Sequence, residues 1–322
     1  MPHWQLQTPV AFFIFNRPET TARVFEAIRQ ARPPMLLVVA DGPRSDHPDD
    51  VEKCAAARSV IDRVDWDCEV LTNFSDTNMG CKRRISSGLD WVFSIVEAAI
   101  ILEDDCLPGM DFFRFCDELL VRYAHDTRIG MISGNNFGFK LYDNTLSYCF
   151  SKHGLIWGWA TWKRAWQKYH DVKCLSEEEL QLIKSNISDN QEFVNTWWEG
   201  AQAALQGKLD TWDYLWGVAR YANNFLTIRP KVNLVANIGF GETATRTKGR
   251  PNPQYLDIGK LEFPLTHPKI VVPDPIADKM LEDMFVSIGK LGVSHKMKTW
   301  AKYGIRTCLS IKSWITSAGN KR

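Results

Sequence analysis

The sequence predicts an α/β fold, with a mostly parallel β-sheet flanked by helices and a C-terminal helical extension. Two observations predict this class. Over the first 105 residues, short apolar runs alternate with longer segments of helical periodicity, which is typical of a parallel sheet wrapped by helices. The runs are continuously apolar, which indicates strands buried on both faces.

The first two strand–helix pairs follow directly from this alternation. Residues 9–15 (PVAFFIF) are an apolar run and predict a strand, and residues 16–32 predict the helix after it. Residues 35–42 (MLLVVADG) predict a second buried strand that ends in an Asp-Gly pair. Residues 48–64 predict the second helix.

The third pair and the fourth strand complete the first half. Residues 67–74 (DCEVLTNF) predict a strand, and residues 82–96 have apolar side chains at helical spacing. Residues 98–102 (AAIIL) predict the fourth strand. In such sheets ligands bind beyond the carboxyl ends of the strands.

The pattern changes beyond residue 125. The elements expected there are a strand and loop over 128–138, a strand followed by an aromatic loop and a helix over 147–169, a helix over 176–206, a helix over 211–224 that begins at Thr211 or Asp213, and a strand with a glycine-rich turn over 225–241. We therefore expect one unit in two halves, over 1–125 and 126–265, followed by a C-terminal basic extension over 266–322.

Composition restricts the class of protein. A hydrophobic content of 45% and a charged content of 24% are ordinary for a soluble globular enzyme, and a net charge of +1 predicts no nucleic-acid partner. No apolar run approaches the length of a membrane span, and the N-terminus lacks the pattern of an export signal. The eight cysteines have no metal-ligand spacing, so we expect reduced thiols and a cytoplasmic protein.

The C-terminal residues have a different charge pattern. No acidic residue follows Asp283, whereas residues 290–322 contain eight lysines and arginines interleaved with aromatic and aliphatic side chains. One interpretation is peripheral contact with anionic lipid at the inner face of the plasma membrane. The other is a closing helix that packs on the domain and has a solvated basic face.

Three carboxylates follow the fourth predicted strand directly. Glu103, Asp104 and Asp105 repel one another, and their burial is costly unless a cation or donor compensates. Mn²⁺ or Mg²⁺ takes oxygen ligands and commonly bridges to substrate phosphates, which predicts a metal site here. An acidic helix cap or a solvated loop is the alternative.

Other polar side chains follow the first two strands. Asn16 and Arg17 follow the first strand, and Asp41 ends the second. Arg17 and Arg84 suit phosphate oxygens, or belong to solvated helix faces. Asp41 is suited to accept hydrogen bonds from a base or ribose, or it closes the DGPR turn. Their joint place at one edge of one sheet predicts a binding site.

The second half supplies aromatic residues and a candidate base. Most of its tryptophans have the spacing of core packing, but Gly158 between Trp157 and Trp159 indicates a loop that approaches a ligand closely. Asp213 lies between aromatic side chains and is a general-base candidate, or it caps a helix. His153 is expected to be structural.

Several nucleotide-binding motifs are absent from the sequence. No Gly-x-Gly-x-x-Gly follows the first strand, and no Gly-Lys-Ser/Thr loop occurs. Dinucleotide-binding and P-loop proteins are therefore excluded.

Seven stretches in order resemble one known family. They are PVAFFIFNRP, VVADGPR, GCKRRISSGLDWVF, AIILEDDCLPGMDFFRF, GWATW, TWDYLW and IRPKVNLVANIGFGE, and the likeness spans residues 9–246. They resemble the GT-A-fold glycosyltransferases, especially those of the N-acetylglucosaminyltransferase I type and their bacterial relatives in polysaccharide clusters. The resemblance implies a Rossmann-like fold and an inverting, metal-dependent transfer of a hexosyl or N-acetylhexosaminyl group from a UDP-sugar.

The resemblance also implies a nucleotide-sugar-binding half over 1–125, an acceptor-binding and catalytic half over 126–265, and roles for individual residues. By position, Asn16, Arg17, Asp41 and Arg84 would lie at the nucleotide, Glu103 at the donor sugar, Asp104 at the ribose and Asp105 at the metal. Asp213 would deprotonate the acceptor hydroxyl. Gly239, Gly241 and Glu242 would belong to a loop that closes over the donor, with the glycines as hinges.

The sequence departs from the mammalian pattern, which reads EDDLEV where this chain reads EDDCLP. The expected acceptor is therefore a glycan or lipid-linked glycan of bacterial surface polysaccharide synthesis rather than an N-glycan. Two alternatives stay open, a sugar nucleotidyltransferase and a non-catalytic carbohydrate-binding protein on the same fold. A nucleotidyltransferase would ordinarily need a glycine-rich triphosphate loop, which NRPETT is not.

Overall fold

The computed structural model of this chain describes residues 4–138, 140–239 and 257–290. Its strands are β1 (Val10–Ile14), β2 (Met35–Ala40), β3 (Glu69–Phe74), β4 (Ala98–Glu103), β5 (Cys106–Pro108), β6 (Ile129–Ser133), β7 (Tyr148–Ser151), β8 (Trp159–Trp162), β9 (Leu226–Pro230) and β10 (Val235–Asn237). Its helices are α1 (Pro18–Ala31), α2 (Asp50–Ser59), α3 (Cys81–Ile95), α4 (Met110–Arg122), α5 (Lys163–Trp166), α6 (Glu177–Asn186), α7 (Gln191–Leu205), α8 (Asp213–Ala222) and α9 (Pro275–Lys290), with 3₁₀ helices η1 (Val60–Arg63) and η2 (Gln167–Cys174).

One mostly parallel sheet organises the molecule and confirms the predicted fold class. Its strand order is β3-β2-β1-β4-β8-β6-β9-β7. The first four strands pair in parallel, and β6 and β9 run in the same direction as these four. Strands β8 and β7 run the opposite way. The sheet crosses the boundary expected near residue 125, because β4 pairs with β8.

Alternate side chains of each strand enter two separate cores, one on each face of the sheet. In β1, Ala11 and Phe13 pack with apolar residues of α3, α5, α7 and α8. Val10, Phe12 and Ile14 pack on the other face with residues of α1, η1 and α4. Both faces are thus covered, which explains why β1 is apolar at every position.

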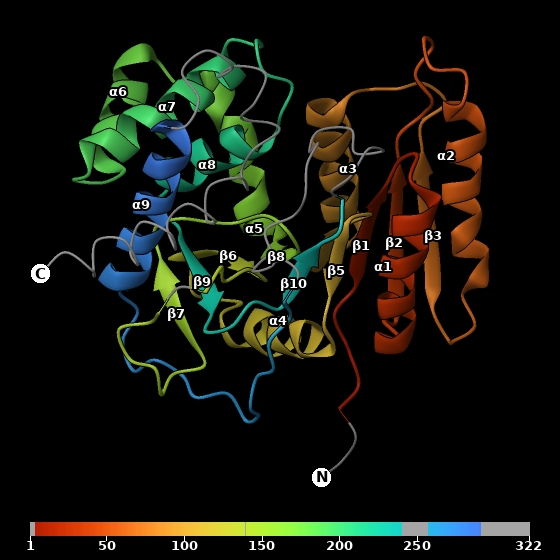
Figure 1. The fold of residues 1–322 in the computed structure, drawn as a ribbon, viewed down its shortest axis with the longest axis horizontal. Coiled ribbons are helices and arrows are strands. Elements are labelled where there is room, and N and C mark those ends of the chain that lie inside the picture. Colours follow the sequence, from red (N-terminus) through yellow and green to blue (C-terminus); the bar gives the residue numbers. More distant parts are fainter. Residues whose placement is uncertain (1–3, 139, 240–256, 291–322) are drawn as a thin grey trace, which may run out of the picture.

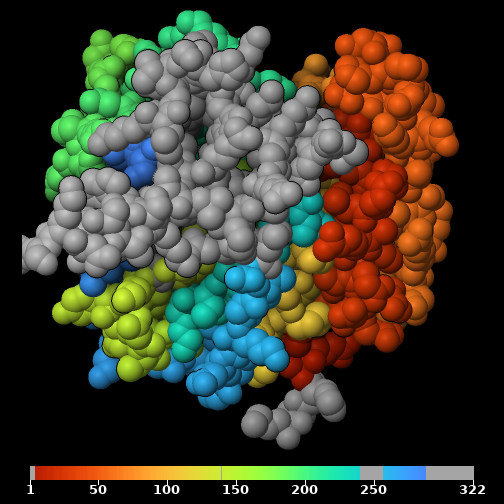
Figure 2. Space-filling model, in the orientation of Figure 1, coloured from red at the N-terminus to blue at the C-terminus, as the bar shows by residue number. Residues whose placement is uncertain are grey.

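The helices divide between the two halves of the sheet (Figure 1). Helices α1, α2 and α3 accompany the strands β1 to β3, whereas α6, α7, α8 and α9 gather over the second half. Figure 2 shows the same division on the molecular surface, with the red and orange N-terminal residues on one side and the green residues on the other.

Three elements differ from what the sequence predicted. Residues 159–162, predicted as part of an aromatic loop, form β8 between β4 and β6. The helix expected over 176–206 is two helices, because Asn190 starts α7 by accepting a hydrogen bond from the backbone N–H of Phe193 at 3.1 Å. Helix α4 was not predicted, although it buries an apolar face against the sheet.

A short two-stranded ladder lies beside the carboxyl end of β4. Strands β5 and β10 pair antiparallel, with Asn237 opposite Cys106. Cys106 directly follows Asp105, and the backbone N–H of Ile238 donates to the carbonyl oxygen of Asp105 at 2.8 Å. The ladder therefore fixes the chain before Gly239 against the acidic triplet.

Helix α9 confirms the predicted C-terminal helical extension, up to Lys290. Its buried apolar residues Ala277, Leu281 and Met284 pack on the second half of the molecule. Among the helices in the described ranges, none combines the length and apolar character that crossing a bilayer requires. Residues 291–322, to which nearly all of the expected membrane contact belongs, lie outside the described ranges.

Candidate functional site

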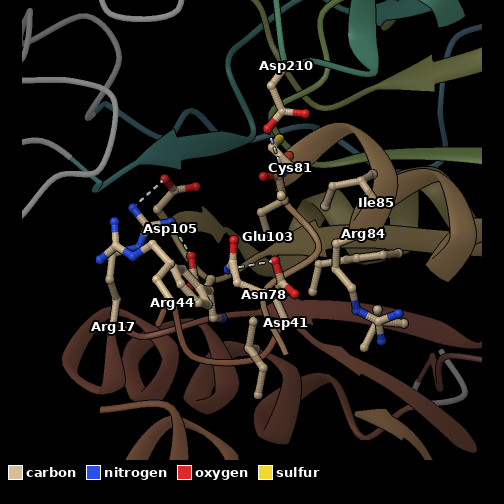
Figure 3. Close-up of a pocket in the computed structure, with 16 residues that line it drawn as sticks. Arg17, Asp41, Arg44, Asn78, Cys81, Arg84, Ile85, Glu103, Asp105 and Asp210 are labelled. Atoms are coloured by element: carbon tan, nitrogen blue, oxygen red, sulfur yellow. Dashed lines mark hydrogen bonds and ion pairs between the residues drawn. The ribbon is translucent and has the colours of Figure 1, made fainter. Parts of the chain in front are cut away.

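A pocket of about 330 Å³ opens at the carboxyl ends of β1, β2 and β4 (Figure 3). The residues that line it are Phe13, Ile14, Phe15, Arg17, Val39, Asp41, Arg44, Asn78, Gly80, Cys81, Arg84, Ile85, Glu103, Asp104, Asp105 and Asp210. Six residues predicted from the sequence are among them: Arg17, Asp41, Arg84, Glu103, Asp104 and Asp105. The geometry of a parallel sheet brings them together, because its strand ends meet at one edge.

Arg17 provides positive charge beside the acidic triplet. Its Nη2 donates a short hydrogen bond to Asp104 Oδ1, and its Nη1 donates to Asp105 Oδ2 at 2.9 Å. Asp104 is 2% exposed, and its Oδ2 accepts from the backbone N–H of Phe15 at 3.2 Å. A buried carboxylate needs such partners, so Arg17 compensates part of the cost of burying the triplet.

The pKa shifts follow from this arrangement. Burial raises the pKa of Asp104, and the attraction of Arg17 opposes that rise. Burial by itself lowers the pKa of Arg17, but the charges of Asp104 and Asp105 reverse the effect and leave it raised. Arg17 is thus held as a cation between two carboxylates.

Asp41 lines the pocket at the end of β2. Its Oδ1 accepts from the backbone N–H groups of Gly42 at 2.9 Å and Met79 at 2.8 Å, and its Oδ2 accepts from Asn78 Nδ2 at 3.0 Å. Burial raises the pKa of Asp41, while the backbone hydrogen bonds lower it. Asp41 thus joins the end of β2 to the loop before α3, and its contact with a nucleotide stays a prediction.

Arg84 is tied to the sheet. Its Nε donates to the carbonyl oxygen of Ala40 at 3.1 Å, and its Nη2 donates to the carbonyl oxygen of Asn73 and to Asn73 Oδ1. Burial lowers the pKa of Arg84. The side chain lines the pocket, but these acceptors hold its guanidinium at the ends of β2 and β3.

Asn16 does not line the pocket, although it supports a residue that does. Its Nδ2 donates to Asp50 Oδ1 at 2.7 Å, and Asp50 Oδ2 accepts from Arg44 Nε at 2.6 Å. Arg44 lines the pocket and lies over the ring of Phe15, 5.5 Å from its centroid. Arg44 was not predicted from the sequence. Its position in DGPR, directly after the second strand, could have indicated it.

Asp210 was also missed. It lies in the second half of the chain, and its carboxylate accepts from the backbone N–H groups of Cys81 at 3.1 Å and Lys82 at 3.2 Å. These are the first residues of α3, so Asp210 caps that helix from a distant segment. In Figure 3 it lies away from Arg17 and Asp41. No local pattern connects Asp210 with a helix 129 residues earlier.

Helix α8 begins at Asp213, which was one of its two predicted starting points. Its Oδ1 accepts a short hydrogen bond from Thr211 Oγ1. Asp213 is not among the pocket-lining residues, but Asp210, three residues earlier in the same segment, is. The role of Asp213 as a base stays a prediction.

The aromatic stretch 157–159 packs into the core. Trp159 is 1% exposed and stacks on Trp212 with ring centroids 5.5 Å apart. Gly158 has φ +66°, and a Cβ there would lie 2.7 Å from Val235 Cγ2. Trp157 is half-buried and packs edge-on against Phe137. The close approach of the backbone at Gly158 is thus an approach to β10. Trp159, which was predicted to lie in a loop, lies in β8.

Gly239 lies against the ion pair at the acidic triplet. A Cβ at this residue would lie 2.2 Å from Asp105 Oδ2 and 2.8 Å from Arg17 Nη1. Only a glycine allows the backbone this close to both groups. Gly241 and Glu242 of the predicted donor loop lie outside the described residues.

The carboxylates of this pocket suit a hard divalent cation only if phosphate and water supply the remaining oxygen ligands. Asp105 Oδ2 accepts from Arg17 and Oδ1 from Cys106 Sγ at 3.5 Å, so few carboxylate oxygens are available. The described ranges contain no group of three or more histidine, cysteine, aspartate or glutamate residues that could hold a metal ion. Carboxylate oxygens fit Mn²⁺ or Mg²⁺ where phosphate and water supply the other ligands.

The fold and site define an α/β protein with carboxylates and arginines gathered at the carboxyl edge of its sheet. His153 lies elsewhere, buried between Tyr221 Oη at 2.8 Å and Glu282 Oε1 at 3.0 Å, which confirms its structural role.

Comparisons with known proteins add distant structural likenesses. No protein-family model and no curated protein sequence matches the chain. A mannosyltransferase from Pyrobaculum calidifontis, in complex with GDP-Man and Mn²⁺, is 14% identical with a TM-score of 0.32, over 50% of this chain and 45% of its own. The chain thus spans less than half of that protein.

Two further solved structures are similar at the same level. A 4-diphosphocytidyl-2C-methyl-D-erythritol synthase from Anaerococcus prevotii is 11% identical with a TM-score of 0.33, over 53% of this chain and 77% of its own. A UDP-glucose pyrophosphorylase complexed with UDP-glucose is 8% identical with a TM-score of 0.36, over 70% of this chain and 90% of its own. TM-scores this low do not establish a shared function.

Proposed function

We propose that this chain is an inverting, metal-dependent glycosyltransferase that moves a hexosyl or N-acetylhexosaminyl group from a UDP-sugar to a hydroxyl of a glycan or lipid-linked glycan. The observation that supports it best is the pocket at the carboxyl ends of β1, β2 and β4, where three carboxylates and Arg17 meet. The resemblance of seven sequence stretches to the GT-A glycosyltransferases supports the reaction type. Bacterial surface polysaccharide synthesis is the proposed setting.

The donor would lie along the ends of the first four strands. Asp41 would accept from the base, Asp104 would lie at the ribose, and Glu103 would contact the donor sugar. Arg17 has a buried Nε with no hydrogen-bond partner among the residues that the structure describes, so it has a donor available for a phosphate oxygen. Asn16 would act through Asp50 and Arg44 rather than by direct contact.

Asp105 would hold the divalent cation, with phosphate and water completing its coordination. When bound, the cation would neutralise negative charge on the departing diphosphate. Gly239 would keep the backbone close to this carboxylate, and Gly241 and Glu242 would follow in the donor loop.

The proposed transfer is a single displacement. Asp213 accepts the proton of the acceptor hydroxyl, whose oxygen forms a bond to the anomeric carbon. The bond from that carbon to the diphosphate oxygen breaks on the opposite face, and its electron pair leaves with UDP. Configuration at the anomeric carbon is therefore inverted. Trp157 and Gly158 would shape the approach to this centre from the second half.

The deciding experiment incubates the purified chain with Mn²⁺ and a panel of UDP-sugars, with and without lipid-linked glycan acceptors. Sugar transfer with release of UDP supports the proposal. Asp213→Asn should lower turnover by on the order of 10²-fold or more, with UDP binding retained. Asp171→Asn, which changes an exposed carboxylate of the same half, should leave turnover unchanged.

Other outcomes support the alternatives. Release of pyrophosphate from a nucleoside triphosphate and a sugar phosphate indicates a sugar nucleotidyltransferase. Binding of sugars with no turnover, unaffected by Asp213→Asn, indicates a carbohydrate-binding protein.

We further propose a cytoplasmic protein that contacts anionic membrane through residues 290–322. The support is the run of eight basic residues without an acidic one. Flotation with vesicles that contain anionic lipid should recover the full chain but not a chain truncated after Lys290. Equal recovery of both chains contradicts the contact.

A further inference from the structure

The guanidinium of Arg17 makes two bonds of different character. Nη2 is bound to Asp104, whose side chain is 3% exposed and also accepts from the backbone of Phe15. Nη1 is bound to Asp105, whose side chain is 16% exposed. Removing the partner of a buried carboxylate is strongly destabilising, whereas a more open carboxylate regains water. The bond to Asp104 is therefore permanent, and the bond to Asp105 can be exchanged.

The exchangeable bond occupies the oxygen that a metal ion needs. Asp105 Oδ2 accepts from Arg17, and Oδ1 accepts from the Cys106 thiol. A divalent cation on Oδ2 would lie beside a guanidinium, and the two positive charges repel each other. A metal ion without nucleotide therefore competes with Arg17.

A diphosphate changes this competition. Nη1, once released from Asp105, needs a new acceptor. A phosphate oxygen is suited to this, since charge-assisted hydrogen bonds from a guanidinium to phosphate are strong. The nucleotide therefore stabilises the arrangement in which Asp105 is free for the metal.

We propose that Arg17 is an exchangeable counter-cation that keeps the metal ion weakly bound until the nucleotide diphosphate arrives. This inference rests on the proposed function, because it requires a metal ion and a nucleotide at one site. Arg17 stays on Asp104 throughout and moves its second bond from Asp105 to a phosphate oxygen. Linkage requires that UDP and Mn²⁺ then strengthen each other's binding by one and the same factor.

The position of Gly239 fits this exchange. Its backbone lies over both members of the exchangeable pair, since a Cβ would meet Asp105 Oδ2 at 2.2 Å and Arg17 Nη1 at 2.8 Å. A methyl group there would separate the pair without removing either charge. Such a methyl group would also cover Asp105 Oδ2, so a glycine here keeps that oxygen accessible.

The test measures Mn²⁺ binding to the nucleotide-free protein by electron paramagnetic resonance of free Mn²⁺. In Arg17→Lys the ammonium can stay with Asp104 but cannot bridge both carboxylates, as the guanidinium fork does. We expect its Mn²⁺ dissociation constant without UDP to fall about tenfold, a change of about 1.4 kcal/mol. Arg23→Lys, an exposed change on the same helix, should match the wild type.

Calorimetry of UDP binding measures the coupling. In the wild type, saturating Mn²⁺ should tighten UDP binding by at least tenfold, and in Arg17→Lys this factor should be smaller, because only the direct contact of the metal ion with the diphosphate remains. Adding Asp105→Asn to Arg17→Lys should remove the extra Mn²⁺ affinity. Should Arg17→Lys fail to fold, Arg17→Gln, which can still donate to Asp104, should give the same tighter Mn²⁺ binding.

The outcomes separate this inference from the proposed function. Unchanged Mn²⁺ affinity in Arg17→Lys, or in Arg17→Gln where the lysine variant does not fold, with Mn²⁺-dependent UDP binding in the wild type, overturns the inference and leaves the function intact. No Mn²⁺ binding in the wild type, with or without UDP, overturns the metal-dependent function and the inference together.

Discussion

At the scale of single residues, buried charges in the first half are compensated in pairs. Arg17 compensates Asp104, and Arg44 compensates Asp50, so that two arginines reach the pocket on fixed supports. Asp104 and Arg17 were both indicated by the sequence, because each lies just after an apolar strand. The pairing of Arg44 with Asp50 was not, because no local pattern shows which of several nearby carboxylates this arginine meets.

The Asp50–Arg44 pair predicts a pH-dependent stability. The hydrogen bond from Arg44 lowers the pKa of Asp50 to about 2, below the value of about 3.9 in an unfolded chain. The contribution is therefore full above pH 4 and is lost as the pH falls through 2. In urea titrations, wild type should exceed Asp50→Asn by about 2 kcal/mol at pH 7, and the difference should vanish near pH 2.

A difference that stays constant from pH 7 to pH 2 contradicts this prediction. It would mean that the negative charge of Asp50 adds nothing to the free energy of unfolding beyond what a neutral side chain of the same shape provides.

Gly158 allows a test of close packing with a matched control. Gly158 and Gly207 both have positive φ, of 66° and 71°, but a Cβ at Gly207 meets nothing within 4 Å. Gly207→Ala should cost about 1 kcal/mol of unfolding free energy for its backbone, and Gly158→Ala about 1–3 kcal/mol more for its clash with Val235. Chemical denaturation of both variants measures the difference, and equal losses contradict it.

At the scale of elements, the sequence predicted what local periodicity determines. Strands β1 to β4 and helices α1 to α3 were all expected within a few residues, because short runs rich in apolar residues alternate with longer segments that favour helices. Strand β8 was missed because its four residues, Trp159–Trp162, gain their conformation from β4 and β6, which lie far away in the sequence.

Helix α3 links the pocket to the second half through its cap. Asp210→Ala removes two hydrogen bonds at the start of α3, which should cost about 1 kcal/mol. Because Cys81, Arg84 and Ile85 of this helix line the pocket, UDP binding should weaken as well, by about threefold to tenfold. Denaturation and calorimetry measure the two effects.

Asn190→Ala is the matched control. Asn190 caps α7 by accepting from the N–H of Phe193, far from the pocket-lining residues. This variant should lose similar stability with unchanged UDP affinity, and a parallel loss of UDP affinity in both variants would contradict a specific role for Asp210.

At the scale of the whole molecule, helix α9 holds the second half together. Three carboxylates one turn apart face the protein: Asp274 accepts from the N–H of Tyr142 at 2.7 Å, Asp278 from that of Lys152 at 3.1 Å, and Glu282 from Ser188 Oγ at 2.7 Å. Together with the apolar contacts of the same helix, they join it to strands and helices distant in the sequence.

Truncation tests the importance of this helix. A chain ending at Asp274 should lose several kcal/mol of stability or fail to fold, since it exposes core side chains and leaves buried polar partners unsatisfied. A chain ending at Lys290 should keep its melting temperature within a few degrees. Thermal unfolding measures both, and equal melting temperatures would contradict the assignment.

The candidate site was predictable as a location but not as a complete arrangement. The triplet, Arg17 and Asp41 were expected at one sheet edge, because parallel strands have a common direction. Asp210 and the approach of Gly239 were not, because they depend on how the second half folds back on the first. The sequence does not encode such contacts in any local period.

The central place of β4 has a consequence for how the chain is made. A ribosome adds about 5–20 residues per second, so the nascent chain waits several seconds after β4 before its second neighbour, β8, exists. During that interval β4 is an open edge, and open edges invite pairing between molecules. Three negative charges at its end repel those of another nascent chain, which opposes such aggregation before the sheet closes.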